Sequence, residues 1–289
     1  MAAQTPIWLI VGASSGFCQS IARDVLGRGH KAIVCARKVE ALNELEHLGA
    51  YPLALDVTAH EQEIASKIKQ ANEIYGGITH LVNGAAFVLE GMIEEISDDE
   101  AFGEFNTNVF GVIKVTRAVL PYMRATETAV TKVIANFGSM GSWTGWVSSG
   151  IYCSTKWAIS GLTEALAEEV APFGIKAVII EPGTFRTELL SSTSGRRVLA
   201  ERRLDEYKEM RDAVHGFMNA TSGAQMGNPT KGATVIVDVL ISTGCAEGRD
   251  IPPRLLLGSD AIETIKQKCS ATVTLIDEWR DVIKSTDIR

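Results

Sequence analysis

The most chemically suggestive pair in the sequence is a tyrosine and a lysine four residues apart. Tyr152 and Lys156 bound the segment YCSTK, at the start of a stretch with helical periodicity. On a helix, residues four apart share one face and are separated by about 6 Å along the axis. A nearby ammonium group favours the phenolate and lowers the pKa of a phenol from about 10. The pair could therefore transfer a proton at neutral pH, although the same spacing also arises by chance.

Two further polar residues precede this pair. Ser139 follows the apolar run 133–137, and Asn108 lies within the segment NTNVFG. Both are candidate active-site residues. Each also has an ordinary structural explanation, because a serine often forms the turn after a strand and an asparagine side chain can bend a helix while bonding locally.

A glycine-rich turn near the N-terminus has the composition of a phosphate-binding loop. The apolar run Ile7–Val11 leads directly into the segment GASSGFC, which begins at Gly12 and precedes an amphipathic helix. Glycine permits a tight turn, and N–H groups at a helix N-terminus bind pyrophosphate. An ordinary strand-to-helix turn would have a similar composition.

The same segment also matches GxSxG, the nucleophile elbow of α/β-hydrolases, with Ser14 as the nucleophile. A serine esterase of that kind would need a histidine late in the chain, and His215 is the candidate.

A basic pair stands where many NAD-binding folds have an acidic residue. About twenty residues after the glycine-rich turn, such folds place a carboxylate that binds the ribose hydroxyls. This chain has Arg37 and Lys38 there. A carboxylate would repel a 2′-phosphate, whereas a guanidinium can bind it through two hydrogen bonds. The pair favours NADP over NAD, unless both residues merely begin a solvated helix.

Short apolar runs alternate with segments of helical periodicity along the whole chain. This alternation predicts one Rossmann-type, doubly wound α/β domain over residues 1–289, with a seven-stranded parallel sheet flanked by helices. Strands are predicted at 7–12, 31–36, 52–56, 78–83, 131–137, 175–181 and 254–257, and helices at 16–29, 39–48, 60–76, 98–124, 151–172, 229–243 and 259–284.

Two segments do not fit the simple alternation. Residues 184–228 are too long for an ordinary loop, so we expect a substrate lid or a locally disordered excursion. Within it, the stretch from Arg196-Arg197 to Arg202-Arg203 has mixed charges and indicates a solvated lid helix, with a grip on an acidic substrate as the alternative. A C-terminal extension at 254–289 is expected to pack in the core or between subunits.

Composition excludes several classes of function. The 289 residues carry 28 Lys+Arg and 35 Asp+Glu, and 46% are hydrophobic, as in globular proteins with a large core. The acidic balance argues against a nucleic-acid partner. Five cysteines without a CxxC pair predict neither a disulfide framework nor a metal site.

The chain lacks the start of a secretory signal and any membrane-spanning apolar run, so a cytoplasmic location is expected.

Taken in chain order, these motifs resemble the short-chain dehydrogenase/reductase family over nearly the whole sequence. Three positions depart from the family pattern: Val11 replaces a threonine, Cys18 replaces the third glycine, and NGAA replaces the NNAG turn. The matching segments are Gly12–Cys18, Asp56-Val57, Asn83-Gly84-Ala85-Ala86, Asn108, Ser139, Tyr152 with Lys156, and Pro182–Thr187.

The resemblance implies an NADP(H)-dependent oxidoreductase in which hydride passes from the nicotinamide to a carbonyl carbon. Ser139 would bind the carbonyl oxygen, and Tyr152 would donate the proton or accept it in the reverse direction. Lys156 would hold the nicotinamide ribose and lower the pKa of Tyr152, while Asn108 would support a proton relay. The implied cofactor-binding residues are Gly12, Ser14, Ser15, Gly16, Phe17, Arg37, Lys38, Asp56, Val57, Asn83, Gly84, Ala85, Tyr152, Lys156, Pro182, Gly183, Phe185 and Thr187.

By the same resemblance, Phe87, Met140, Trp143 and Trp146 line the substrate pocket. Aromatic and thioether side chains in a concave site imply a bulky hydrophobic ketone or secondary alcohol, cyclic or aromatic. The two tryptophans could instead pack a loop against a helix. The family also suggests a homodimer or homotetramer. Because Cys18 and the NGAA turn depart from the pattern, a non-redox NADP(H)-binding sensor or scaffold remains the main alternative.

Overall fold

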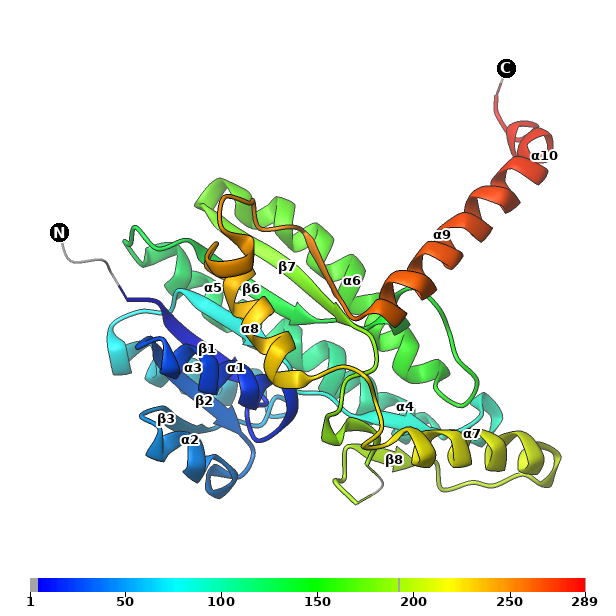
Figure 1. Cartoon of the computed structure of the whole chain (residues 1–289), viewed down its shortest axis with the longest axis horizontal. Helices are drawn as coiled ribbons and strands as arrows, with labels where there is room; N and C mark the ends of the chain where they lie inside the picture. Colours follow the sequence, from blue (N-terminus) through cyan, green and yellow to red (C-terminus); the bar gives the residue numbers. More distant parts are fainter. Residues whose placement is uncertain (1–4, 192, 289) are drawn as a thin grey trace.

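A computed structural model describes residues 5–191 and 193–288 and contains a parallel sheet of seven strands (Figure 1). The strand order is β3-β2-β1-β4-β6-β7-β9. The order reverses between β1 and β4, and ligands of such sheets bind at this switch point, beyond the carboxyl ends of the strands. The strands are β1 (Ile7–Val11), β2 (Lys31–Ala36), β3 (Tyr51–Ala54), β4 (His80–Asn83), β6 (Lys132–Phe137), β7 (Ile175–Pro182) and β9 (Arg254–Leu257).

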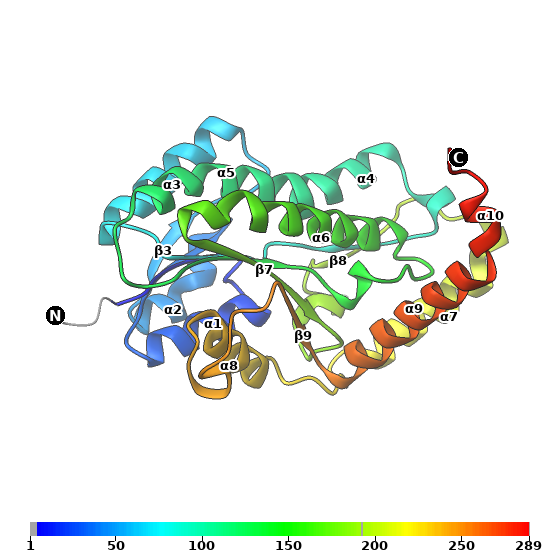
Figure 2. The same ribbon diagram turned by 90° about the horizontal axis from the view of Figure 1, so that it is seen from above.

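Helices cover both faces of the sheet, as Figure 2 shows. Helices α1 and α8 pack on one face, and α3, α5 and α6 cover the other. The predicted α/β fold with seven parallel strands is therefore confirmed. The helices are α1 (Gly16–Gly27), α2 (Asn43–His47), α3 (Glu61–Tyr75), α4 (Asp98–Phe105), α5 (Gly111–Ala125), α6 (Gly150–Val170), α7 (Lys208–Thr221), α8 (Pro229–Leu240), α9 (Ser259–Glu278) and α10 (Arg280–Lys284).

Burial on both faces explains why the strands are almost continuously apolar. In β1, Trp8 and Ile10 join the core beneath α1 and α8, whereas Leu9 and Val11 join the core beneath α3 and α5. Successive side chains of a strand point to opposite faces, so both sets must be apolar when helices cover both sides. The strand ends are thereby fixed relative to the helix starts that follow them.

The helix predicted over residues 98–124 is confirmed as a helical stretch, but a π-helical turn divides it into two α-helices. Helix α4 ends at Phe105, the π-helical turn Asn106–Phe110 follows, and α5 begins at Gly111. Within that turn, Asn108 accepts a hydrogen bond from the backbone N–H of Phe87 and donates one to its carbonyl. A single π-helical turn inserts an extra residue and often marks a functional site.

The long segment at residues 184–228 contains helix α7 and a strand that the sequence did not predict. Strand β8 (Arg197–Leu199) pairs in parallel with β5 (Val88–Glu90) to form a separate two-stranded sheet. Helix α7 begins only at Lys208 and no residue of the arginine-rich stretch 196–203 is helical, so the lid helix starts later in the chain than predicted. We call residues 184–228 the lid, because they lie over the cleft described below.

The C-terminal helices project away from the body of the molecule in Figure 1. In α9, only Ala261 and Ile265 are buried, so the helical part of the extension contributes little to the core, whereas Leu257 of β9 is buried in it. Among the described residues, no helix has both the length and the apolar character that crossing a bilayer requires.

Candidate active site

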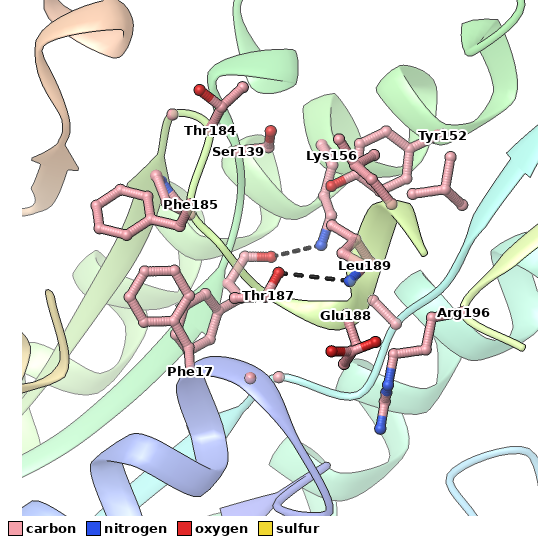
Figure 3. Close-up of a pocket in the computed structure, with 18 of the residues that line it drawn as sticks. Phe17, Ser139, Tyr152, Lys156, Thr184, Phe185, Thr187, Glu188, Leu189 and Arg196 are labelled. Atoms are coloured by element: carbon pink, nitrogen blue, oxygen red, sulfur yellow. Dashed lines mark hydrogen bonds between the residues drawn. The ribbon is translucent and has the colours of Figure 1, made fainter. Parts of the chain in front are cut away.

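A cleft with two lobes opens at the carboxyl ends of the central strands. The first lobe, of about 200 Å³, lies between the glycine-rich turn, the start of α6 and the lid (Figure 3). The second, of about 280 Å³, lies beside the ends of β2 and β3. Gly12, Ala86 and Arg196 line both lobes, so the lobes adjoin each other. A cleft of this shape at the switch point suits a dinucleotide.

Three of the four predicted catalytic residues meet in the first lobe. Tyr152 and Lys156 lie on α6, and Ser139 follows β6 (Figure 3). The Ser139 hydroxyl accepts a hydrogen bond from the backbone N–H of Gly141, which holds its side chain at the strand end. The Lys156 ammonium donates to the carbonyl oxygen of Phe137 at 2.8 Å and lies 5.6 Å from the centre of the Tyr152 ring.

Burial governs the protonation of these groups. Desolvation raises the pKa of Tyr152, and the hydrogen-bonding Ser139 hydroxyl opposes that rise. Desolvation also lowers the pKa of Lys156 to about 8. The pKa of Tyr152 is raised in this arrangement because the desolvation of the phenol outweighs its other interactions, and the lowering effect of Lys156 stays a prediction.

Asn108 lines neither lobe of the cleft, but it binds residues next to the active site. Its side chain binds both backbone groups of Phe87 and donates to the Thr155 hydroxyl at 3.2 Å. The fourth predicted catalytic residue therefore ties the start of α6 to the segment after β4, and it fixes the position of the neighbouring Tyr152 and Lys156.

Glu104 is a site residue that the sequence motifs did not indicate. It is fully buried on α4, one turn before Asn108, and its Oε1 accepts a hydrogen bond from the backbone N–H of Leu89. Its Oε2 has no hydrogen-bond partner. Burial raises the pKa of this carboxyl to about 8, so it holds its proton at neutral pH. When ionised, it would raise the pKa of both Tyr152 and Lys156.

The glycine-rich turn has the geometry of a phosphate cradle. Gly12 has a φ of +88°, and a Cβ there would lie 2.7 Å from the backbone nitrogen of Ala85. A side chain at this position would therefore clash as well as strain the backbone. The part of the cleft beside this turn and the first N–H groups of α1 fit the pyrophosphate of a dinucleotide.

Most of the predicted cofactor residues line the cleft. Lys38 and Asn83 do not: Lys38 is exposed outside both lobes, and Asn83 is buried and donates to Thr116 and Asn136. The residues that do line it are Gly12, Ser14, Ser15, Gly16, Phe17, Arg37, Asp56, Val57, Gly84, Ala85, Tyr152, Lys156, Pro182, Gly183, Phe185 and Thr187.

The serine-esterase alternative fails on geometry. The Ser14 hydroxyl accepts a hydrogen bond from Arg196 at 2.9 Å. The Nδ1 atom of His215 instead lies 3.1 Å from Glu90 and 2.7 Å from Arg197. Since the histidine is engaged elsewhere, it cannot activate Ser14 as a triad requires.

The sequence profile of the family described as short chain dehydrogenase matches residues 6–197. The chain belongs to this family. An oxidoreductase named BOA17 from Botryotinia fuckeliana is 32% identical to it over 283 residues, covering 96% of this chain and 98% of the relative. An NADPH-dependent pterin aldehyde reductase from Arabidopsis thaliana is 32% identical over 232 residues, covering 77% and 91%.

The crystal structure of a short-chain dehydrogenase from Streptomyces avermitilis has 33% identity and a TM-score of 0.87, covering 99% of this chain and 100% of that one. Family membership makes the protein an oxidoreductase of the NAD(P) type.

Two departures from the short-chain dehydrogenase pattern compensate each other. Cys18 carries a side chain where the family usually has its third glycine, and Gly84 lacks one where the family has asparagine. A Cβ on Gly84 would lie 2.2 Å from the Cys18 sulfur. The thiol thus occupies the space above Gly84 and donates a weak hydrogen bond to the Val11 carbonyl. The turn therefore stays closely packed, because the larger residue at position 18 fills the space left by the smaller residue at position 84.

The predicted substrate residues divide between different places. Met140 and Trp146 line the first lobe, as expected, whereas Phe87 lines the second lobe and therefore faces the adenosine side. Trp143 lines neither lobe, because its ring packs under the Arg254 guanidinium at 4.6 Å. Sequence analysis did not single out three apolar lid residues that complete the first lobe: Leu189, Leu190 and Met218.

The compensation between Cys18 and Gly84 predicts a non-additive pair of substitutions. Gly84→Asn alone should destabilise the protein by about 1–3 kcal/mol, because the new side chain overlaps the Cys18 sulfur. Adding Cys18→Gly should recover much of that loss. Urea unfolding of the single and double variants measures the coupling. Strictly additive effects would show that the two residues do not compensate each other.

Proposed function

We propose that this protein is an NADP(H)-dependent oxidoreductase that reduces a bulky hydrophobic ketone to a secondary alcohol, or catalyses the reverse reaction. The observation that carries the proposal is the meeting of Ser139, Tyr152 and Lys156 in a lobe that opens onto the glycine-rich turn. In the cytosol, the expected compartment, an excess of NADPH over NADP⁺ favours reduction.

The cofactor supplies the hydride, and the residues of the chain orient the carbonyl group and move its proton. Ser139 donates a hydrogen bond to the carbonyl oxygen, and Tyr152 gives its phenolic proton to the same oxygen. The Lys156 ammonium has three donors, of which one is used by the Phe137 carbonyl. The others are available for the ribose hydroxyls and for stabilising the developing phenolate.

Arg37 supports the preference for NADP. It lines the second lobe beyond β2, where a 2′-phosphate on the adenosine ribose would lie, and its charge contributes to lowering the pKa of Asp56. The Arabidopsis relative, whose name includes NADPH dependence, agrees with this choice.

The walls of the first lobe support a hydrophobic substrate. Met140, Trp146, Leu189 and Met218 line this lobe together with the catalytic residues. These side chains would hold a ring or an acyl chain mainly by burial of apolar surface, while Ser139 and Tyr152 fix the carbonyl. A cyclic or aromatic ketone fits this distribution of groups.

The projecting C-terminal helices support a homodimer. Val273 and Ile276 on α9, Trp279 between the two helices and Ile283 on α10 are each about half exposed and recur at intervals of three or four residues. A helix with such a stripe needs a partner surface, and a second copy of the chain supplies one.

Replacing Tyr152 by phenylalanine tests the proposed reaction. We expect turnover to fall at least a hundredfold, because the proton donor is lost, while NADPH binding stays within about threefold of wild type. Oxidation of NADPH with alicyclic and aromatic ketones measures turnover, and fluorescence titration measures NADPH binding. A sensor would differ: its wild-type form would bind NADPH but turn over no ketone in the panel.

The cofactor preference is tested by Arg37→Met, with Lys38→Met as the matched control. Loss of a charge-assisted bond to the 2′-phosphate should raise the dissociation constant of NADPH about tenfold or more and leave that of NADH almost unchanged. Lys38 is a neighbouring cation outside the cleft, so its substitution should change neither constant. Tighter binding of NADH than NADPH by the wild type would contradict the NADP assignment.

The dimer is tested by the double substitution Ile276→Glu and Trp279→Glu. Two buried carboxylates would be incompatible with an apolar interface, so the wild-type dimer should become a monomer with an unchanged fold. Light scattering after size-exclusion chromatography gives the mass, and Lys266→Glu on the same helix is the control. A dimer that survives the double substitution would show that the interface lies elsewhere. A wild-type monomer would show that the chain does not dimerise.

A further inference from the structure

Two neighbouring arginines of the lid have different surroundings. Arg197 is buried and makes a salt bridge to the buried carboxylate of Glu90 at 2.6 Å. Its guanidinium also donates to the Asn219 side chain and to the Leu190 carbonyl. These bonds tie β8 to β5 and to α7. Arg197 is therefore an internal anchor of the lid, and the sequence expectation of a solvated position is wrong for it.

The anchor at Arg197 fixes the position from which Arg196 reaches the cleft. Arg196 lines both lobes and is one of the labelled residues around the pocket in Figure 3. Its Nη2 donates to the Ser14 hydroxyl at 2.9 Å, across the cleft in the glycine-rich turn. A guanidinium has five N–H donors, so most of them are left for another acceptor.

The charge of Arg196 is poorly compensated by the protein. Burial lowers the pKa of Arg196 and the nearby Arg37 adds to this, whereas Cys18 and Glu188 act in the opposite direction without reversing it. No ion pair within 4.0 Å involves Arg196 or Arg37 in the described parts of the chain, residues 5–191 and 193–288. Arg196 and Arg37 thus both line the second lobe, and neither is ion-paired with Glu188 or Asp56, the carboxylates that act on them. Such an arrangement is suited to an anion with several oxygens.

We propose that Arg196 binds a phosphate group of the dinucleotide and that this contact holds the lid closed over the cofactor. The inference rests on the proposed function, since it assigns a lid residue to the same cofactor. The position where the lobes join suits the pyrophosphate, and the proximity of Arg37 suits the 2′-phosphate. Both are phosphate oxygens, and the experiment distinguishes them.

The segment that carries Arg196 also reaches the substrate side of the cleft. Leu189 and Leu190 belong to the same lid segment as Arg196 and form part of the wall of the first lobe. A cofactor phosphate bound to Arg196 would therefore also hold the part of the lid that forms this apolar wall.

The test compares Arg196→Met with wild type, with Arg196→Lys as the conservative variant and Arg203→Met as the control. Arg203 is an exposed arginine of the same lid that lines neither lobe. Titration calorimetry uses NADPH, ADP-ribose and 2′-phospho-ADP-ribose as probes. We expect Arg196→Met to weaken NADPH about tenfold to a hundredfold, Arg196→Lys to lose less, and Arg203→Met to match wild type.

The two fragments identify the phosphate. Equal weakening of both fragments assigns Arg196 to the pyrophosphate, whereas weakening of only 2′-phospho-ADP-ribose assigns it to the 2′-phosphate. Unchanged constants for all three probes would overturn the proposal while leaving the proposed function intact. Failure of the wild type to bind any of the probes would contradict both.

Limited proteolysis supplies a readout of lid closure that does not depend on activity. NADPH at saturating concentration for each form should protect the lid of wild type and of Arg203→Met from cleavage, but protect Arg196→Met much less. Equal protection of all three would show that Arg196 does not hold the lid closed, even if its loss weakens the cofactor.

Discussion

The active site depends on the burial of the Lys156 ammonium against the carbonyl oxygen at the end of β6. A desolvated lysine would be costly without a partner, and the Phe137 carbonyl provides one at 2.8 Å. This bond joins α6 to the sheet at the point where Ser139 begins the next turn. Because Tyr152 lies one helical turn before Lys156, the same contact sets the distance between phenol, hydroxyl and cleft. The catalytic geometry is therefore a consequence of how one helix packs on one strand.

Departures from a family pattern have to be judged in pairs. Considered singly, Cys18 crowds a turn that usually holds glycine, and Gly84 removes a side chain from a loop that usually holds asparagine. In three dimensions the sulfur occupies the space that the missing side chain leaves. The close approach of the turn to Ala85 survives, so neither departure indicates a lost phosphate site. This compensation weakens the structural reason for regarding the protein as a non-redox NADP(H)-binding sensor or scaffold.

Sequence could predict what depends on local pattern, and it failed where distant contacts decide. Apolar runs gave the seven strands to within two residues at each end, because both faces of the sheet are covered. The π-helical turn at Asn108 arises from its bonds to Phe87, and β8 forms only against β5, so neither has a local signal. Trp143 was misplaced because Arg254, far along the chain, offers its ring a cation. Glu104 lacks a motif altogether; its significance lies in its burial beside Asn108 and Leu89.

The lid shows how one segment can serve both halves of the site. Buried charge pairs, Arg197 with Glu90 and Arg211 with Glu95, attach it to the segment 88–95 that follows β4. Such pairs contribute more to a unique arrangement than to net stability, since desolvation offsets most of their attraction. Just before the first of these anchors in the chain, Arg196 lines both lobes while Leu189 and Leu190 line the first lobe. Sequence changes at the apolar positions could alter substrate choice while the anchors, the cofactor contact and the catalytic helix remain unchanged.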